Sequence, residues 1–344
     1  MTKILIADDS AVARAVLRDI FRATTDLTVV GEAGNGQEAV DLTAQLKPDL
    51  VIMDIMMPIM DGLAAIEIIM ARFPTPILVL SATMDDREVN HAFTAIRKGA
   101  LDVMAKPGIQ GLDPGGDFAS MIIEKVRTLA RVRVIRRWPS NRRGTALKPA
   151  TPGGERGILA IGASTGGPKA VMRILNSLPS HFSGAVFVVQ HIASGFARGF
   201  AQWLDRDSAI TVRLAVDGDP YGAGTALVAP NDCHMSLDRG KVVLMPGEPV
   251  NCCRPSIDVL FNSLAREEGS RVVGVLLTGM GKDGAAGMAS IRAQGGLTIA
   301  QDERSCAVFG MPRAAIALNA VDEVLPLEAI PDAIIRIFSA SSEI

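Results

Sequence analysis

Aliphatic strand-like runs alternate with helix-like segments along almost the whole chain, and this alternation limits the fold more than any other feature. In the first half the strand candidates are ILIA (4–7), TVVGEA (28–33), LVIM (50–53), PILVL (76–80) and LDVMA (101–105). Helical patterns separate them, and one more covers about 117–135. Such alternation predicts right-handed crossovers that build a parallel sheet with helices on both faces.

The second half begins near Gly157 and alternates again. Strands are expected at GILAIG, AVFVVQ, VVGVLL and LTIA, with helices after Gly167 and around 196–204, 257–267 and 285–293. Asp238-Arg239-Gly240 lies between two alternating segments and indicates a hairpin. We therefore predict a second, doubly wound and mostly parallel α/β domain with an antiparallel hairpin at one edge.

A basic stretch separates the two halves. No acidic residue occurs between Glu124 and Glu155, and turn-forming residues accumulate there. Basic residues accumulate there, among them Arg131, Arg133, Arg136, Arg137, Arg142, Arg143 and Lys148. We interpret 126–154 as a solvated linker between domains at 1–125 and 155–344. The formal net charge of −2 gives no general attraction to nucleic acid, so no nucleic-acid partner is expected.

The sequence also limits the compartment. No apolar run approaches the roughly 20 residues of a membrane span, and MTKILIADDS does not have the pattern of a signal peptide. The four cysteines match no metal-ligand spacing and no disulfide framework. Cys252 and Cys253 are interpreted as reduced thiols. We expect a cytosolic protein that is not inserted into a membrane.

Polar residues stand at four strand ends of the first half. Asp8 and Asp9 follow the first strand, Asp54 ends the third, Ser81 ends the fourth and Lys106 follows the fifth. Carboxylates around one crevice repel each other, and Mg²⁺ relieves that repulsion. A carboxylate can attack phosphorus, while a lysine and a hydroxyl can bind the transferred oxygens. Taken singly, each Asp could instead be a helix cap or turn residue.

As a set, these residues carry a resemblance. ILIADDS, VIMDIMMPIMDG, LVLSA and Lys106-Pro107 occur in the order found in the receiver domain of bacterial response regulators. The resemblance implies a flavodoxin-like fold with a five-stranded parallel sheet, phosphorylated by a histidine kinase. It implies Asp54 as the phosphoacceptor, Asp8 and Asp9 as further Mg²⁺ ligands, and Ser81 and Lys106 as the residues that sense the phosphoryl group.

The second half contains a nucleophile motif. Gly162-Ala163-Ser164-Thr165-Gly166 is a G-x-S-x-G between a predicted strand and a predicted helix, a turn that exposes a hydroxyl. It could also be a Gly-rich turn with a helix cap. Dinucleotide binding is disfavoured because the glycine spacing is wrong and Gln190-His191 stands where an acidic residue is required.

Two further residues fit the same chemistry. His191 follows the strand AVFVVQ, and Asp283 lies in TGMGKDG after VVGVLL. The carboxyl ends of parallel strands converge on one crevice, so a nucleophile, a base and an orienting acid could meet there. A lone histidine after a strand is more often structural, and Asp283 could be a helix cap. Together with Ser164, however, they indicate a serine hydrolase.

These motifs belong to a longer pattern. IGASTGGP, VVQHI, APNDCHM, RPSIDVLF, LLTGMGKDGAAGM and AQDERSCAVFGMP resemble the catalytic domain of chemotaxis protein-glutamate methylesterases over about 157–342. The resemblance implies Ser164 as nucleophile, His191 as base and Asp283 as its orienter. Thr165 would help hold the His191 ring, and the Met280 N–H would help bind the oxyanion. Cys252-Cys253 replaces the more usual polar pair before Arg-Pro-Ser, a segment to which no chemistry is assigned.

We therefore expect phosphorylation of Asp54 to activate hydrolysis of methyl esters on chemoreceptor glutamates, with deamidation of receptor glutamines by the same route. No cofactor is expected for the esterase reaction. The unphosphorylated receiver is expected to inhibit by covering the Ser164 crevice. Two other classes stay open, a receiver-controlled serine hydrolase for another ester or amide and a receiver with a non-enzymatic output. The chain lacks a helix-turn-helix pattern, which argues against DNA binding as that output.

Overall fold

A computed structural model describes residues 1–81, 86–106, 116–132, 134 and 156–339. The chain divides into two compact units, Met1–Pro139 and Ser140–Ile344. The division falls inside the predicted linker, most of which, including its basic residues from Arg133 onward, lies outside the described residues. No helix of the described segments combines the length and apolarity needed to cross a bilayer.

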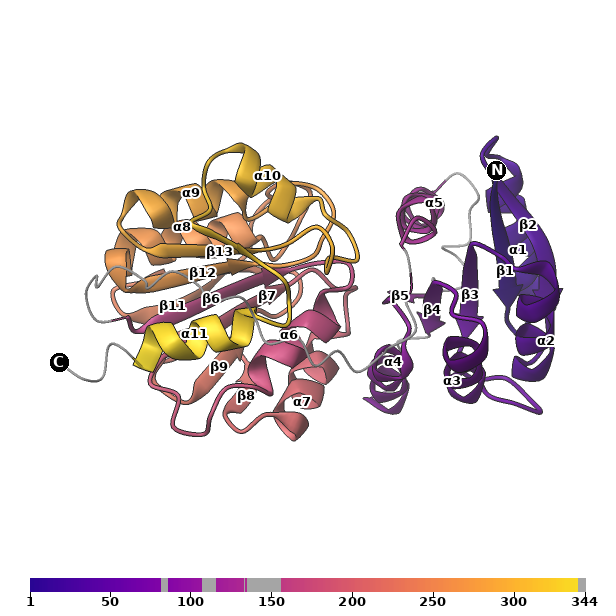
Figure 1. Cartoon of the computed structure of the whole chain (residues 1–344), viewed down its shortest axis with the longest axis horizontal. Coiled ribbons are helices and arrows are strands. Elements are labelled where there is room, and N and C mark those ends of the chain that lie inside the picture. The colour runs from indigo at the N-terminus through magenta and orange to yellow at the C-terminus, as the bar shows by residue number, and fades with distance from the viewer. Residues whose placement is uncertain (82–85, 107–115, 133, 135–155, 340–344) are drawn as a thin grey trace. The chain divides into compact units, whose positions relative to one another are not determined.

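The first unit alternates five strands with five helices. Its elements are β1 (Thr2–Ala7), α1 (Ala11–Arg22), β2 (Leu27–Ala33), α2 (Gly36–Leu46), β3 (Leu50–Asp54), α3 (Gly62–Arg72), β4 (Ile77–Ser81), α4 (Asp86–Lys98), β5 (Asp102–Ala105) and α5 (Asp117–Leu129). The strands form one parallel sheet in the order β2-β1-β3-β4-β5, the flavodoxin-like order. Helices α1 and α5 cover one face, and α2, α3 and α4 cover the other (Figure 1). The predicted five-stranded parallel sheet is confirmed.

Local sequence explains where these helices begin. Ser10, Asn35 and Asp61 each precede a helix and accept a hydrogen bond from a backbone N–H of its first turn. Such side chains satisfy helix N–H groups that have no partner within the helix. The last helix is shorter than predicted, because α5 ends at Leu129 instead of extending to about 135.

The second unit is larger. Its elements are β6 (Ile158–Ala163), α6 (Gly167–Leu175), β7 (Ala185–Gln190), α7 (Ala197–Asp207), β8 (Thr211–Leu214), β9 (Thr225–Val228), β10 (His234–Asp238), β11 (Lys241–Met245), α8 (Ile257–Glu268), β12 (Val272–Leu276), α9 (Ala285–Ala293), β13 (Leu297–Gln301), α10 (Met311–Ala317), β14 (Glu323–Leu325) and α11 (Ile330–Ser339). Seven strands form a sheet in the order β14-β13-β12-β6-β7-β9-β8. Every pair in it is parallel. Helices α8, α9 and α10 cover one face, and α6, α7 and α11 cover the other (Figure 1).

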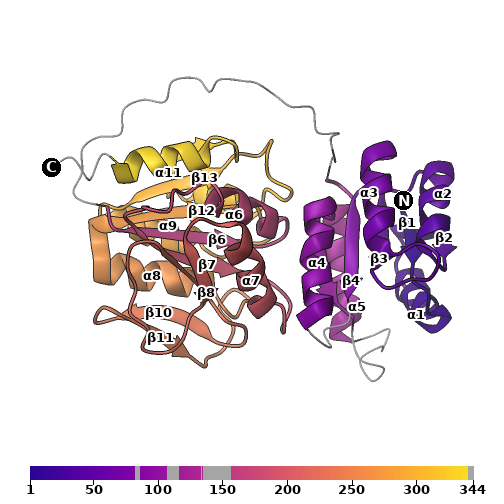
Figure 2. The same cartoon turned by 90° about the horizontal axis from the view of Figure 1, so that it is seen from below.

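The predicted hairpin forms, but it does not extend the main sheet. β10 and β11 pair antiparallel as a two-stranded sheet of their own, while β14 and β8 occupy the edges of the seven-stranded sheet. The hairpin packs against α8 (Figure 2), where the Leu237 N–H donates to the Ser263 hydroxyl at 3.0 Å. The prediction that the hairpin lies at an edge of the main sheet was therefore wrong, because the hairpin buries its apolar side against α8.

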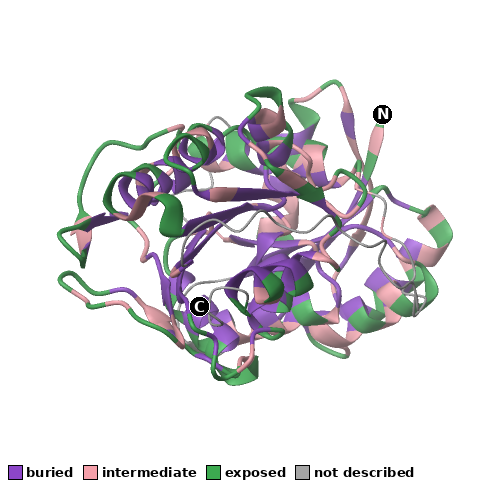
Figure 3. Cartoon of the chain, turned by 60° about the vertical axis from the view of Figure 1, so that its left-hand side comes forward, coloured by how far each residue is buried: buried purple, intermediate pink, exposed green. Residues whose placement is uncertain are grey.

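The central strands are buried on both faces (Figure 3). All residues of β6, β7 and β12 are buried, as their uninterrupted aliphatic runs predict for a parallel sheet. Helix α8 contributes Ile257, Leu260, Phe261 and Leu264 to the same core. These buried strands hold the loops at their carboxyl ends, where the candidate site lies.

Candidate functional site

Ser164 and His191 follow neighbouring strands at matching positions. Strand β6 lies between β12 and β7, and the last residues of β6 and β7, Ala163 and Gln190, are direct partners. The His191 N–H continues the ladder by donating to the Ala163 carbonyl at 2.9 Å. The two predicted residues therefore leave adjacent strands side by side. Within the described residues, however, the Ser164 hydroxyl makes no hydrogen bond to the His191 ring.

The turn that carries Ser164 is fixed by backbone contacts. Its N–H donates to the Thr278 carbonyl at 3.0 Å, and its carbonyl accepts from the Gly167 N–H at 2.8 Å. Gly166 has a φ of 76°, which favours glycine, and α6 starts at the next residue. Ser164 itself is half-buried. The hydroxyl thus stands at a helix N-terminus, where developing negative charge is stabilised.

Asp283 binds the His191 ring. Its Oδ2 lies 2.9 Å from His191 Nε2, and the residue is only 2% exposed. Four other donors converge on the same carboxylate. They are Asn251 Nδ2 at 3.0 Å, Ser256 Oγ at 2.8 Å, the Ile257 N–H at 2.7 Å and the Asp258 N–H at 3.3 Å. The carboxylate is therefore held rigidly at the start of α8.

The same contacts keep Asp283 ionised. Burial is the largest influence on its pKa and works to raise it. The hydrogen bond and charge of His191 outweigh that effect, helped by hydrogen bonds from Asn251 and the Ile257 N–H, so the pKa of Asp283 lies below its ordinary value. An ionised carboxylate accepts the proton on Nε2, which leaves Nδ1 as the unprotonated nitrogen of a neutral ring.

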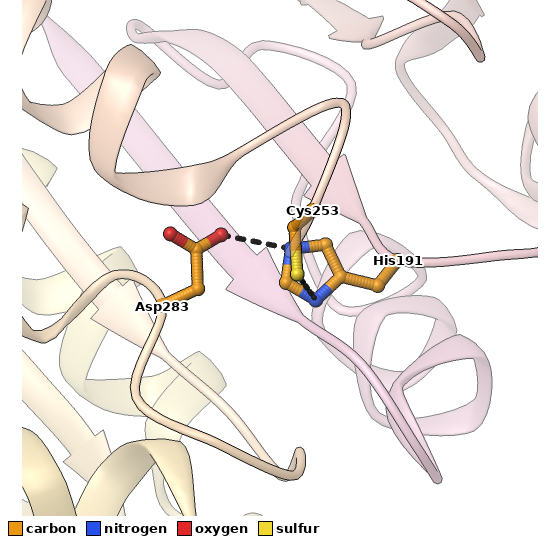
Figure 4. A group of neighbouring side chains, drawn as sticks. All are labelled: His191, Cys253 and Asp283. Carbon is orange, nitrogen blue, oxygen red and sulfur yellow. Dashed lines mark hydrogen bonds and ion pairs between the residues drawn. The ribbon is translucent and has the colours of Figure 1, made fainter. Parts of the chain in front are cut away.

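Cys253 lies against that second nitrogen. Its Sγ is 3.6 Å from His191 Nδ1 (Figure 4) and 3.4 Å from the Asn251 carbonyl oxygen. A turn closed by the backbone pairing of Val250 and Cys253 places the thiol there. Burial, with further contributions from Asp283 and Cys252, raises the pKa of the Cys253 thiol to about 12. The group is a neutral thiol at neutral pH.

Gln190 ties the two strand ends together. Its Nε2 donates to the Ser164 carbonyl at 2.8 Å and to the His191 carbonyl at 2.9 Å. The residue is 3% exposed, and a side chain at Gly167 would collide with Gln190 Oε1 at 2.2 Å. One buried amide therefore fixes the backbone of both residues.

Thr165 and Met280, the two residues expected to support catalysis, lie in the loops after β6 and β12, but their contacts do not test the expected roles. Thr165 is 7% exposed and its carbonyl accepts from the Thr278 hydroxyl at 2.9 Å, but within the described residues its own hydroxyl is not hydrogen-bonded to His191. Met280 follows β12 in the loop where Gly279 pairs with Phe309. The roles expected for Thr165 at the ring and for the Met280 N–H at the oxyanion stay predictions.

A second cluster occupies the carboxyl edge of the first unit's sheet. Lys106 Nζ lies 2.8 Å from Asp8 Oδ2 and 2.9 Å from Asp54 Oδ2. Its backbone N–H donates to the Ser81 carbonyl at 2.8 Å. A pocket of about 260 Å³ opens here, lined by Asp9, Asp54, Ile55, Met56, Ser81, His91 and Lys106. The structure thus brings the five polar residues identified in the first half to one edge.

The charges in this pocket influence one another. Burial raises the pKa of Asp54 above its ordinary value, the nearby charge of Lys106 offsets part of this, and Asp8 adds to it. For Lys106, burial works to lower the pKa, but its hydrogen bonds and charge interactions with Asp8 and Asp54 raise it. Carboxylate oxygens of Asp8, Asp9 and Asp54 lie within 4.8 Å of one another. Such hard oxygen donors fit Mg²⁺.

Sequence reasoning missed four contributors to the second unit's site. Asn251 and Ser256 hold Asp283, Cys253 contacts His191, and Gln190 binds the Ser164 and His191 carbonyls. Arg254-Pro255-Ser256 belongs to a longer motif for which the sequence predicts no chemistry. A signal was available in Ser256, which precedes an apolar helix as a cap would, although nothing in the spacing indicates that it also binds an aspartate 27 positions away.

Comparison with known proteins accounts for both units. The model of the CheB methylesterase family matches residues 159–334, and that of the response regulator receiver domain matches residues 4–111. The chain belongs to the CheB methylesterase family. It therefore combines a receiver domain with a hydrolase domain of that family, as the sequence motifs predicted.

Relatives of this family match along nearly their whole length. A protein-glutamate methylesterase/protein-glutamine glutaminase of Anaeromyxobacter dehalogenans is 43% identical over 332 residues, covering 96% of each chain. One from Pseudomonas aeruginosa is 42% identical over 343 residues, covering 97% of this chain and 96% of the relative. The crystal structure of the Thermotoga maritima CheB methylesterase catalytic domain is 38% identical, with a TM-score of 0.52, and covers 53% of this chain and 99% of that chain.

Proposed function

We propose that this CheB-family protein hydrolyses methyl esters on receptor glutamates and releases methanol, and that it deamidates receptor glutamines by the same route. The observation that carries the proposal is the His191–Asp283 hydrogen bond directly beside Ser164, which leaves the adjacent strand in register. The names of the relatives supply the substrate class. The geometry by itself supports acyl transfer by a serine nucleophile.

Ser164 attacks the ester carbonyl while His191 Nδ1 takes its proton. Nε2–H stays hydrogen-bonded to Asp283, whose negative charge stabilises the imidazolium. The imidazolium then returns the proton to the leaving methoxide, and methanol departs from the acyl-enzyme. Water, deprotonated by His191, releases the glutamate carboxylate and regenerates Ser164. For a glutamine substrate, the leaving group is ammonia.

The Ser164–His191 hydrogen bond forms in the substrate complex, since catalytic hydrogen bonds are often long before substrate binds. Negative charge that develops on the carbonyl oxygen is stabilised by the N-terminus of α6 and by the Met280 N–H. Thr165 supports the His191 ring. These roles for Thr165 and Met280 rest on the family resemblance together with their place beside Ser164.

In the receiver domain, Asp54 is the residue that a histidine kinase phosphorylates. Its carboxylate attacks the phosphoryl donor, and Lys106 and Ser81 contact the transferred oxygens. Asp8, Asp9 and Asp54 would hold Mg²⁺, which relieves their mutual repulsion and neutralises phosphoryl charge. The proximity of these three carboxylates and the two ion pairs of Lys106 support this assignment.

The receiver controls the esterase. Without phosphorylation it restrains the catalytic domain, and phosphorylation of Asp54 shifts the population to the active form. The presence of both domains in one chain supports this proposal. A truncated chain that starts near residue 150 is expected to hydrolyse substrate faster than the unphosphorylated whole chain. Equal rates would refute inhibition. The cytosolic location stays a prediction.

The test is methanol release from methylated chemoreceptors, with and without a small phosphodonor. The phosphodonor is expected to accelerate release, and Ser164→Ala is expected to lower turnover by several orders of magnitude. Ser194→Ala is a matched control, because Ser194 also lies on a loop but its hydroxyl is bonded to exposed Asp232. Near wild-type turnover by Ser164→Ala would exclude Ser164 as the nucleophile. Activity only on other esters would indicate a different substrate class.

A further inference from the structure

Three side chains with metal-ligating atoms meet beside Ser164. His191, Cys253 and Asp283 come from three separate loops, and one ligand atom from each lies within 4.8 Å of the others (Figure 4). The set contains imidazole nitrogen, thiol sulfur and carboxylate oxygen. Imidazole and thiolate favour zinc and similar soft or borderline ions over Mg²⁺.

The separation of sulfur and nitrogen already suits such an ion. With bonds of about 2.3 Å to sulfur and about 2.0 Å to nitrogen, tetrahedral zinc holds these two ligands about 3.5 Å apart. Cys253 Sγ and His191 Nδ1 are 3.6 Å apart. An ion could therefore bridge them with little movement of either side chain.

Asp283 supplies the outer support that metal-bound histidines usually have. It binds Nε2 at 2.9 Å and is itself held by Asn251, Ser256 and backbone N–H groups. A carboxylate on the far nitrogen fixes the tautomer that presents Nδ1 to a metal. The contacts that prepare His191 for catalysis thus also prepare it to ligate.

We propose that Cys253 Sγ and His191 Nδ1 form an inhibitory site for a zinc-like divalent cation, with Asp283 holding His191 from the far side. Water completes the coordination. The bound ion occupies the nitrogen that would accept the Ser164 proton, so it stops the reaction. The binding site stands on geometry alone, whereas the inhibition rests on the proposed esterase function.

Binding exchanges a proton for the metal. The Cys253 S–H bond breaks, its electron pair forms the bond to the cation, and the proton passes to solvent, while Nδ1 donates its lone pair and Nε2 keeps its hydrogen. No oxidant or reductant takes part. Since the thiol must ionise, the affinity rises with pH. Burial, which raises the pKa of Cys253 to about 12, makes this dependence persist across neutral pH.

The neighbouring cysteine provides a matched control. Cys252 is exposed, and no contact between its thiol and His191 is present in the described part of the chain. The left-handed φ values of Asn251 (52°) and Cys252 (62°) turn the backbone so that Cys253 faces the ring. Two adjacent thiols of the same chain therefore differ in their position relative to the site.

The experiment uses the full-length protein, phosphorylated with a small phosphodonor, in excess Mg²⁺, which saturates the oxygen site of the receiver. Co²⁺ is added first, as a spectroscopic substitute for zinc, and the thiolate-to-cobalt charge-transfer band is recorded. Zn²⁺ inhibition of methanol release is then measured, each variant being compared with its own metal-free rate. The variants are Cys253→Ser, Cys253→Ala and Cys252→Ser, with circular dichroism as the test of folding.

Wild type and Cys252→Ser are expected to show the band and to be inhibited by Zn²⁺. Both Cys253 variants should lose the band and need at least ~100-fold more Zn²⁺, since even outer-shell partners change metal affinity 10–100-fold. A band that persists in a folded Cys253 variant, or unchanged inhibition, would overturn the proposal. If the wild type released no methanol, the proposed function would fail, while the cobalt band would still test the site.

Discussion

The Ser256 hydroxyl donates a 2.8 Å hydrogen bond to Asp283 Oδ1. Ser256 Oγ also accepts the Val259 N–H at 3.4 Å, so Ser256 is both the N-cap of α8 and a support for Asp283. It is completely buried. One side chain therefore both starts helix α8 and helps to hold the carboxylate that is proposed to orient His191.

Ser256→Ala is expected to lower both stability and turnover. Loss of the cap and of a buried hydrogen bond should reduce the free energy of unfolding by about 1–3 kcal/mol. Turnover should fall more than substrate affinity, because the change acts through Asp283 on the His191 ring. Chemical denaturation and steady-state kinetics measure the two effects. Ser290→Ala, which removes an exposed hydroxyl bonded to the Ala286 carbonyl, should change neither, and equal effects from both variants would contradict this role.

Gln190→Glu tests whether the hydrogen bonds from Gln190 to the Ser164 and His191 carbonyls position these two residues. A carboxylate cannot donate to the Ser164 and His191 carbonyls, and it would place a negative charge in a buried position. We expect a lower kcat and a loss of about 1–3 kcal/mol of stability. Gln37→Glu, on the exposed side of α2, is the control. A Gln190→Glu protein with wild-type kcat would show that the Gln190 hydrogen bonds do not position Ser164 and His191 for the reaction.

The pKa of Asp283 predicts how stability depends on pH. Because this pKa is lowered in the folded protein, the carboxylate contributes stability above its unfolded value of about 3.9. That contribution is lost as pH falls through the lower folded pKa. Asp283→Asn removes the titration, so its unfolding free energy should decline less steeply below about pH 4. Parallel curves from acid-dependent denaturation would contradict the lowered pKa.

The same substitution should affect catalysis strongly. Asparagine cannot stabilise the imidazolium, and it favours the wrong histidine tautomer. By analogy with a serine-protease triad, kcat for methanol release should fall about 10⁴-fold. Asp219→Asn is the control, because Asp219 binds Arg213 and the Val216 N–H and shares no hydrogen-bond partner with Asp283 among the described residues. A comparable loss in the control would assign the effect to structure and not to the carboxylate at the ring.

Lys106→Met should alter the pH dependence of Asp54 phosphorylation. Burial raises the pKa of Asp54 and Lys106 opposes this, so removing the ammonium should raise that pKa further. Since the nucleophile is the ionised carboxylate, the rate with a small phosphodonor should fall at a higher pH than in the wild type. Lys125→Met breaks a comparable ion pair with Asp102 and should leave the profile in place. Overlapping profiles for Lys106→Met and wild type would refute the coupling.

The first sheet and the central strands β13, β12, β6 and β7 of the second could be predicted from sequence because each has an aliphatic run. The short strands β8, β9 and β14 were not predicted. The same reasoning placed Ser164, His191 and Asp283 at strand ends that the sheet order β12-β6-β7 brings together. The positions of residues at strand ends are predictable because paired parallel strands end at the same edge of the sheet.

The segment between β11 and α8 could not be predicted in the same way. It has no periodicity, and the direction of its side chains depends on left-handed φ values at Asn251 and Cys252 that sequence does not specify. The positions of Cys253 and Asn251 in the site could therefore not be predicted from the sequence. The hairpin was misplaced for a related reason, since turn residues predict its pairing but not the helix against which it packs.

Ser164 and His191 leave β6 and β7 in register, and this has a structural consequence. The distance between the backbones of Ser164 and His191 is set by the constant separation of neighbouring strands, about 4.8 Å. Surrounding loops can lengthen, shorten or exchange residues without altering that spacing. Such a scaffold allows the surrounding loops to change while the relative position of Ser164 and His191 is kept.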